Sequence, residues 1–191
     1  MPEKNNPIDG ERLLETYRIF HLLRQAADAI HRAREIELKK YNLSPEQAGA
    51  LVCIRSLGNT ATPAELSRWL FRERNTITIL LKRMYKLGLI KKRADTRRKN
   101  IIRLSLTKKG YEAYEHAVEF EAFKTVIDTL PERKRKQLWS LLELVRVKLF
   151  KDMRLNLAAY SGCFDKAVIL EPDGSRGRAA GRQKTSKVLA K

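Results

Sequence analysis

Residues 76 to 110 have the sequence TITILLKRMYKLGLIKKRADTRRKNIIRLSLTKKG, and this stretch decides the fold. Apolar residues recur at helical spacing up to Gly88, which is a plausible C-cap. Two β-prone runs, LIKKRAD and IIRLSL, then flank a turn around residues 96 to 100. The stretch therefore predicts a helix followed by a β-hairpin.

The predicted turn is rich in positive charge. Residues 91 to 100, KKRADTRRKN, place six cationic side chains around a single acid, Asp95. Their mutual repulsion must be offset by something outside the chain, so the partner should be strongly anionic. We expect Asp95 to accept backbone hydrogen bonds in the turn, to hold Arg97 in position, or to do both.

A capped helix is predicted upstream of this stretch, beginning in LSPEQ. Ser44 is placed as its N-cap, Pro45 at its first helical position and Gln47 as the capping-box partner. This helix extends to about Leu57.

The same signal recurs in NTATPAEL. Thr62 caps a short helix, Pro63 opens it, and Glu65 can reach back to complete a second capping box. We expect that helix to bury Leu66 and Leu70. Two short capped helices, a turn, a further helix and a hairpin make a winged helix-turn-helix.

Longer helices flank this module. One is predicted from about Ile8 to Tyr41, and two more from Thr107 to about Asp128 and from Pro131 to about Met153. The first would be some 45 Å long at about 1.5 Å per residue. Their apolar content exceeds what they could hide alone, so we expect them to pack on a second subunit; the alternative is a helix that wraps its own domain.

The predicted fold is therefore mainly α with a small β-hairpin wing, in which dimerisation helices flank the winged helix-turn-helix. We expect one domain over residues 1–160, with the winged module at about 44–106. Residues 161–191 mix Gly, Ser, Arg and Lys without periodicity and are predicted to form a disordered basic tail. That tail would add affinity for any duplex.

Composition narrows the class of partner. The 191 residues include 40 Lys and Arg against 22 Asp and Glu, and the resulting net charge of +18 favours a polyanion. The two cysteines, Cys53 and Cys163, are too few for a disulfide framework, and no stretch is apolar enough for a membrane span. We therefore expect a cytoplasmic protein that does not enter a membrane.

The helix in residues 74–86 has two different faces. Ile77, Leu80, Leu81 and Met84 fall within about 100° of one another and form a stripe suited to a core. The opposite face carries Asn75, Thr76, Thr78, Ile79, Lys82, Arg83 and Lys86. No acid interrupts it, whereas a merely solvated face usually alternates Glu and Lys.

That face suits the DNA major groove. Asn can pair with adenine, Thr or Ile can touch a thymine methyl group, and Lys or Arg can bind guanine or phosphate. The hairpin tip would then reach the flanking backbone or minor groove. The candidate DNA-binding residues are Arg72, Arg74, Asn75, Thr76, Thr78, Ile79, Lys82, Arg83, Asp95, Arg97, Arg98 and Lys99.

Over residues 10 to 153 the chain resembles the MarR family of winged-helix transcriptional regulators. The similarity lies in LSPEQAGALVCI, TPAELSRWL, the stretch quoted first, its Asp-x-Arg wing at Asp95 and Arg97, and LTKKG. The resemblance implies a homodimer that binds double-stranded DNA at a pseudo-palindrome, usually as a repressor released by a small molecule or by oxidation. It also implies an effector crevice for an aromatic or phenolic compound, which we place near Tyr17 and His21.

One departure from the family concerns cysteine. Family members that sense peroxide carry a thiol early in the first helix, whereas this chain has none before Cys53. We interpret Cys53 as a structural residue of the second helix. Cys163, in or near the tail, is badly placed to move the DNA-binding helices.

Two other classes of function fit the sequence less well. A basic packaging or RNA-associated protein without sequence choice would also explain the net charge, although the Asn and Thr face argues against it. No catalytic, phosphate-binding or metal motif is present, so we predict no enzyme activity, no metal and no cofactor.

Overall fold

The structure is a computed structural model that describes residues 7–98, 100–157 and 160. Side chains are described from residue 10 onward. The predicted tail at 161–191, with Cys163, lies outside the described residues, and so does Lys99.

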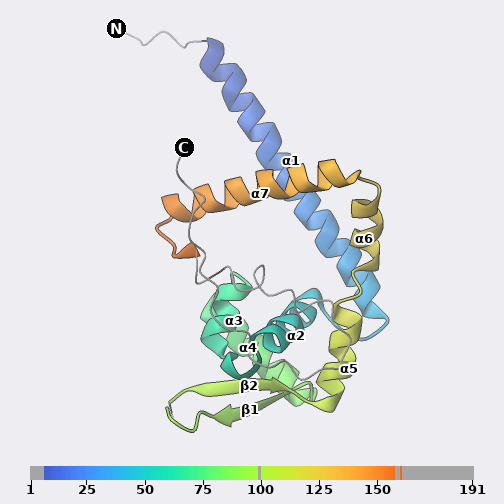
Figure 1. Cartoon of the computed structure of the whole chain (residues 1–191), viewed down its shortest axis with the longest axis vertical. Coiled ribbons are helices and arrows are strands. Elements are labelled where there is room, and N and C mark those ends of the chain that lie inside the picture. The colour runs from blue at the N-terminus through green and yellow to red at the C-terminus, as the bar shows by residue number, and fades with distance from the viewer. Residues whose placement is uncertain (1–6, 99, 158–159, 161–191) are drawn as a thin grey trace.

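Helices and one hairpin make up the described chain (Figure 1). They are α1 (Pro7–Lys39), α2 (Pro45–Leu57), the short 3-10 helix η1 (Gly58–Thr60), α3 (Pro63–Trp69), α4 (Arg74–Lys86), β1 (Ile90–Ala94), β2 (Ile102–Leu106), α5 (Lys108–Ala117), α6 (Glu121–Asp128) and α7 (Glu132–Asp152). The elements from α2 to α5 form the winged module. In Figure 1, α7 crosses the long α1, and the hairpin lies at the opposite end of the molecule.

The first predicted capping box is confirmed, and the second is only half formed. The Gln47 backbone N–H donates to Ser44 Oγ at 3.3 Å, and the Ser44 N–H donates to Gln47 Oε1 at 2.9 Å. Thr62 Oγ1 likewise accepts from the Glu65 N–H at 3.2 Å. The Glu65 carboxylate does not complete the box, because it pairs with Arg68 at 2.6 Å.

α4 ends as its sequence predicts. Gly88 has a φ of 69°, a left-handed conformation that glycine adopts without steric strain. Its N–H donates to the Tyr85 carbonyl at 3.0 Å, and the Leu89 N–H donates to the Met84 carbonyl at 3.0 Å. This pair of bonds is the Schellman motif, which stops the helix and turns the chain directly into β1.

The wing is the hairpin of β1, β2 and the residues between them. Its strands are antiparallel, with a register from Ile90 opposite Leu106 to Ala94 opposite Ile102. The Leu104 N–H also donates to the Ala61 carbonyl at 3.0 Å, so the loop after η1 adds a contact at the other edge of β2.

The core lies inside the winged module. All four residues of the apolar stripe of α4 are buried, as predicted: Ile77, Leu80, Leu81 and Met84. Leu66 is also fully buried, whereas Leu70 is only partly buried. Cys53 is buried in the same core, which agrees with a structural role.

The prediction of one helix from Thr107 to Asp128 was wrong, because the helix is interrupted between α5 and α6. Phe120 has a φ of 48° there, which is rare for a non-glycine residue. Its ring lies under the Arg34 guanidinium at 4.1 Å, and the next N–H, of Glu121, donates to Glu37 Oε1 at 3.0 Å. Contacts with α1 therefore hold a break that local helix propensity does not predict.

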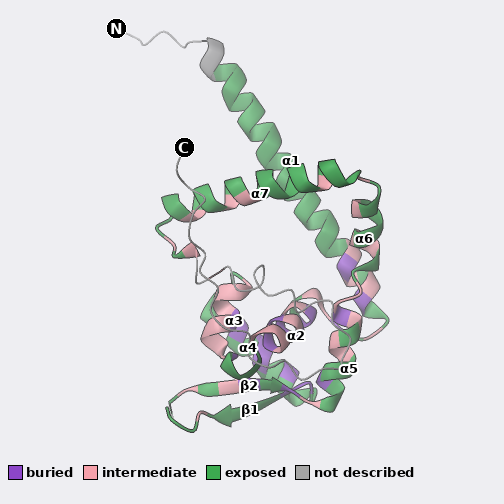
Figure 2. Ribbon diagram, in the orientation of Figure 1, coloured by how far each residue is buried: buried purple, intermediate pink, exposed green. Residues whose placement is uncertain are grey.

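The flanking helices leave much of their apolar surface exposed. Figure 2 shows buried residues gathered in the winged module and at the lower end of α1, while most of α1 and α7 is exposed. Among the described residues, no helix is long and apolar enough to cross a membrane.

Candidate nucleic-acid interface

α4 carries the predicted DNA-binding face, and its apolar stripe fixes which side points outward. Every predicted residue of that face is exposed: Asn75, Thr76, Thr78, Ile79, Lys82, Arg83 and Lys86. Arg72 and Arg74, at the start of the helix, are exposed as well. Ile79 is 63% exposed, although an aliphatic side chain gains nothing from contact with water. Thr78 directs its hydroxyl hydrogen to the Arg74 carbonyl at 2.9 Å, which leaves its methyl group and acceptor lone pairs for a ligand.

The turn before α4 sets where the helix begins. The Ser67 hydroxyl donates to the Arg72 carbonyl at 2.6 Å, and the Arg72 N–H donates to the Ser67 carbonyl at 3.0 Å. The N-cap residue, Glu73, makes no capping hydrogen bond through its side chain. The first N–H groups of α4 are therefore not capped by that side chain, and helix N-termini favour anions.

At the wing, Asp95 has one of the two predicted roles. Its Oδ1 accepts the backbone N–H groups of Arg97 and Arg98, each at 2.9 Å, so it forms the turn as expected. The guanidinium that it holds is not that of Arg97 but that of Arg103, whose Nε lies 2.6 Å from Asp95 Oδ2. Arg97 and Arg98 remain exposed at the tip.

Arg103 was not among the site residues predicted from the sequence, although the predicted hairpin held a signal for it. Arg103 stands directly opposite Arg93 in the hairpin. Like charges in directly opposed positions destabilise a strand pair, so one of them needs a counter-ion. Asp95 is the nearest acid in sequence, and hydrogen bonds first from Arg103 and then from the two tip N–H groups hold the pKa of Asp95 at about 2.

A crevice of about 780 Å³ lies between the wing and the helix-turn-helix. Three predicted DNA-binding residues, Arg74, Thr78 and Arg98, line it. Its other lining residues were not predicted from the sequence to bind DNA. Its cationic and hydroxyl-bearing residues are Thr60, Thr62, Arg68, Arg74, Thr78, Arg98 and Arg103. Four arginines therefore line the crevice, and its one acid, Glu65, is paired with Arg68.

A second crevice, of about 350 Å³, lies on the other side of α4. Its wall includes a hydrogen bond between α1 and α2, in which His31 Nε2 lies 3.0 Å from Glu46 Oε1. Partial burial raises the pKa of Glu46, but hydrogen bonds with His31 and Ser44 oppose this, and the net shift is downward. The remaining lining residues are Pro45, Leu70, Arg72, Thr76, Ile77, Ile79, Leu80 and Arg83.

The predicted effector residues lie elsewhere on α1. Tyr17 and His21 are neighbours, with ring centroids 5.8 Å apart, but neither lines this second crevice. Tyr17 is 61% exposed. Figure 2 shows that α1 is exposed along most of its length away from the winged module.

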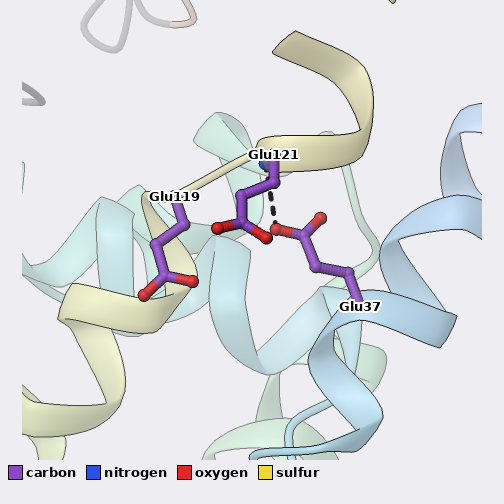
Figure 3. A group of neighbouring side chains, drawn as sticks. All are labelled: Glu37, Glu119 and Glu121. Atoms are coloured by element: carbon purple, nitrogen blue, oxygen red, sulfur yellow. Dashed lines mark hydrogen bonds between the residues drawn. The ribbon is translucent and has the colours of Figure 1, made fainter. Parts of the chain in front are cut away.

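Three glutamates meet where α1 reaches the α5–α6 break (Figure 3). Oxygen atoms of Glu37, Glu119 and Glu121 lie within 4.8 Å of one another. Each carboxylate already has a protein partner: Glu37 pairs with Arg34, Glu119 with His116, and Glu121 with Lys40. The hydrogen bond from His116 holds the pKa of Glu119 below its ordinary value. The cluster is therefore explained as a junction between helices.

Several solved structures share the overall fold of this chain. An organohalide-sensing transcriptional regulator, RdhR-CbdbA1625, solved without ligand, is 27% identical with a TM-score of 0.64 over 78% of this chain and 86% of its own. The same regulator was also solved with 2,4-dichlorophenol bound. A MarR protein from Peptoclostridium difficile is 23% identical, with a TM-score of 0.64 over 70% and 88% of the two chains.

MepR from S. aureus, solved in a complex with DNA, is 20% identical with a TM-score of 0.63 over 68% of this chain and 96% of its own. No protein-family model matches the sequence, and no curated protein matches it significantly.

Proposed function

From the premise that the chain is a winged helix-turn-helix transcriptional regulator of the MarR type, we propose that it is a homodimeric repressor that binds a pseudo-palindromic DNA operator. The observation that carries the proposal is the exposed face of α4. It combines amide, hydroxyl, aliphatic and cationic side chains and contains no acid between Arg74 and Lys86. The cationic wing flanks it across a common crevice.

Each part of this surface has a distinct role on DNA. α4 enters the major groove, where Asn75, Thr78 and Ile79 contact base edges, and Lys82 and Arg83 contact guanine or phosphate. Arg97 at the wing tip reaches the adjacent minor groove, and Arg72, Arg74 and Arg98 hold phosphates. The base contacts carry sequence information, and the phosphate contacts supply affinity and orientation.

Dimer formation follows from the apolar surface of the flanking helices. Large apolar side chains on α1 and α7 are more than half exposed: Leu13, Leu14, Tyr17, Ile19, Phe20, Leu22 and Ile36 on α1, and Trp139, Leu141, Leu144 and Leu149 on α7. Exposed large apolar side chains in such number are typical of helices that pack on another subunit. A two-fold dimer would place the two copies of α4 about one DNA turn apart, near 34 to 36 Å.

The crevice beside α4 suits the small-molecule effector better than Tyr17 and His21 do. It is lined by apolar side chains together with His31, Arg72 and Arg83, a mixture that fits a small aromatic acid or phenol. Because Ile77 and Leu80 form part of its wall, a ligand there contacts α4 directly. Such a ligand changes DNA affinity only if it binds one arrangement of α4 more tightly than another.

The test of operator binding is footprinting on the DNA upstream of the protein's own gene, with affinities for that site and a scrambled duplex at matched salt. Two protected half-sites about one turn apart and a clear preference for the operator are expected. Equal, salt-dependent affinity for every duplex would instead identify the alternative function, a basic nucleic-acid packaging protein.

Deleting residues 166–191 should lower affinity for both duplexes by similar factors.

The effector is tested with a panel of aromatic acids and phenols, including 2,4-dichlorophenol. A compound that binds the crevice should raise the melting temperature and change operator affinity. Because Ile79 and Arg72 also face DNA, the variant that tests the crevice is His31→Phe, which replaces one polar side chain of the wall opposite α4. If no compound shifts melting or operator affinity, control by this chemical class is excluded.

A further inference from the structure

Arg103 lies in β2 near the tip end of the hairpin, opposite Arg93, and its guanidinium joins the wing tip to the loop before α3. On one side its Nε donates to Asp95 Oδ2 at 2.6 Å. On the other its Nη1 donates to the Thr60 carbonyl at 3.3 Å, at the end of η1. The neighbouring Leu104 N–H donates to the Ala61 carbonyl, also in the loop that leads to α3.

We propose that Arg103 is a positioning residue for DNA binding: it fixes the direction in which the wing tip presents Arg97 and Arg98 to the duplex. This inference rests on the proposed DNA-binding function and names a residue that sets the geometry of that same surface.

The Asp95 carboxylate passes the effect of Arg103 to the tip. Its Oδ2 is held by Arg103, and its Oδ1 accepts the backbone N–H groups of Arg97 and Arg98, each at 2.9 Å. A single carboxylate therefore ties both tip arginines, through their main chain, to the opposite strand. The Asp95 side chain is 13% exposed and that of Arg103 33%, so the pair is largely shielded from water.

Besides this support, the end of the wing is closed by main-chain hydrogen bonds from the Asp95 N–H to the Ile101 carbonyl and from the Ile101 N–H to the Arg98 carbonyl, each at 2.8 Å. A two-stranded hairpin by itself is marginally stable in water. Of the strand residues near the tip, Arg93, Ala94 and Ile102 are exposed, and the buried residues of the wing, such as Ile90 and Leu104, lie nearer its base. The closely spaced cations also repel one another, and Asp95 is the one acid between residues 74 and 111.

Arg103 is poorly placed to bind a DNA phosphate directly. Its Nε and Nη1 are already engaged inside the protein, and two-thirds of its side chain is covered. Arg97 and Arg98 are exposed and carry the charges that DNA meets. Arg103 therefore acts through the tip arginines, and removing it should matter only while those arginines can contact DNA.

The matched pair of variants is Arg103→Gln and Arg93→Gln. The two arginines stand opposite each other, so their side chains share a face of the hairpin and the substitutions remove the same charge from that face. We expect Arg103→Gln to lower operator affinity by about tenfold or more, within the range typical of a lost specific DNA contact. Arg93→Gln measures the effect of charge alone and should lower affinity by a clearly smaller factor.

A double-mutant cycle separates positioning from direct contact. In an Arg97→Ala and Arg98→Ala background, Arg103→Gln should cause little further loss, because its effect passes through those residues. If the losses multiply as independent factors, Arg103 contacts DNA itself and the proposal is overturned. Equal effects of Arg103→Gln and Arg93→Gln overturn it as well.

A readout without DNA keeps this test separate from the proposed function. In Arg103→Gln the carboxyl pKa of Asp95, followed by NMR, should rise from about 2 toward its ordinary value, and the tip amides should exchange faster. The contacts that join Arg103, through the Asp95 carboxylate, to the N–H groups of Arg97 and Arg98 are called the clamp. If neither the Asp95 pKa nor the amide exchange changes, the clamp is overturned even if the parent binds its operator. Failure of the parent to prefer any operator, with the NMR changes present, overturns the proposed function and leaves the clamp standing.

One further variant covers a folding defect. If Arg103→Gln is unfolded at the assay temperature, Arg103→Lys takes its place, because a single ammonium group cannot make both the Asp95 and the Thr60 contacts in the same geometry. Arg103→Lys should then bind the operator more weakly than the parent. Parental affinity and parental tip exchange in this variant overturn the proposal.

Discussion

Arg34 and Glu37 form an ion pair at 2.9 Å in which each side chain is only 7% exposed. Arg34 also donates to the Ala117 carbonyl at 2.8 Å and lies over the Phe120 ring. Glu37 accepts the Glu121 N–H at 3.0 Å (Figure 3). The pair therefore joins α1, which carries exposed apolar surface, to the break between α5 and α6 at the edge of the winged module.

Arg34→Met should destabilise the fold strongly. It leaves the Glu37 carboxylate buried without its counter-ion, and breaking a buried pair in this way typically costs about 3 to 5 kcal/mol. Chemical denaturation measures the loss. The control is Arg32→Met on the same helix, whose pair with Glu35 is 77% and 43% exposed and should contribute less than about 1 kcal/mol. Equal losses in the two variants would contradict the importance of burial.

Gly110→Ala should also destabilise the protein, through a collision. A Cβ at Gly110 would overlap the backbone carbonyl oxygen of Leu89, which cannot move without displacing β1. Overpacking of this kind typically costs about 1 to 3 kcal/mol. Gly10→Ala is the control, because a Cβ there meets nothing within 4 Å and alanine favours an exposed helix. A melting temperature unchanged by Gly110→Ala would show that α5 can shift freely.

Arg97→Ala should weaken operator binding by about 1 to 3 kcal/mol without changing the melting temperature, since the side chain is exposed at the wing tip. Its affinity for a scrambled duplex should also fall, because phosphate and minor-groove contacts are largely independent of sequence. Parental affinity for both duplexes would show that the wing does not touch DNA.

Asn75→Ala should behave differently from Arg97→Ala. Because its amide would pair with a base edge, its loss should reduce the discrimination between the operator and point-mutated operators while affinity for scrambled DNA changes little. The measurement is a set of operator variants titrated at one salt concentration. Uniform weakening on every duplex would place Asn75 on the phosphate backbone instead.

Leu144→Lys tests the dimer. Leu144 on α7 is 66% exposed, so a lysine there is harmless to a monomer but would bury a charge in an interface. Sedimentation at micromolar concentration should show dimers for the parent and a shift toward monomers for the variant. Glu112→Gln on α5, which also raises the net charge by one, is the control for the change of charge. A monomeric parent would remove the dimer proposal altogether.

The wing clamp should be insensitive to pH across the physiological range. The folded pKa of Asp95, about 2, lies below its ordinary value of 3.8. A depressed folded pKa means that the stabilisation is complete above the unfolded value and is lost as the pH falls through the folded one. Amide exchange at Arg97 and Arg98, corrected for intrinsic rates, should therefore stay constant from about pH 8 to pH 4 and increase only near pH 2. A loss of protection already near pH 4 would contradict the Arg103 contact.

Local sequence determined most of the winged module. The capping signal at Ser44, the glycine that ends α4, the alternation of the strands and the helical spacing of the apolar stripe all act within a few residues. Interactions over such short distances in sequence can be recognised directly from the order of the residues. They were enough to predict α2, α3, α4, β1, β2 and the outward face of α4, but not the 3-10 helix η1.

Tertiary structure decided the contacts between segments that are distant in sequence. The helix predicted through Phe120 breaks because Arg34 and Glu37, more than eighty residues earlier, stabilise the break. The Asp95 partner was predicted from the adjacent Asp-x-Arg pattern, but the antiparallel register brings Arg103 to the carboxylate instead. Local propensity is a sum over neighbours in the chain, whereas a buried charge or a strand partner is chosen by which groups the folded backbone brings within reach.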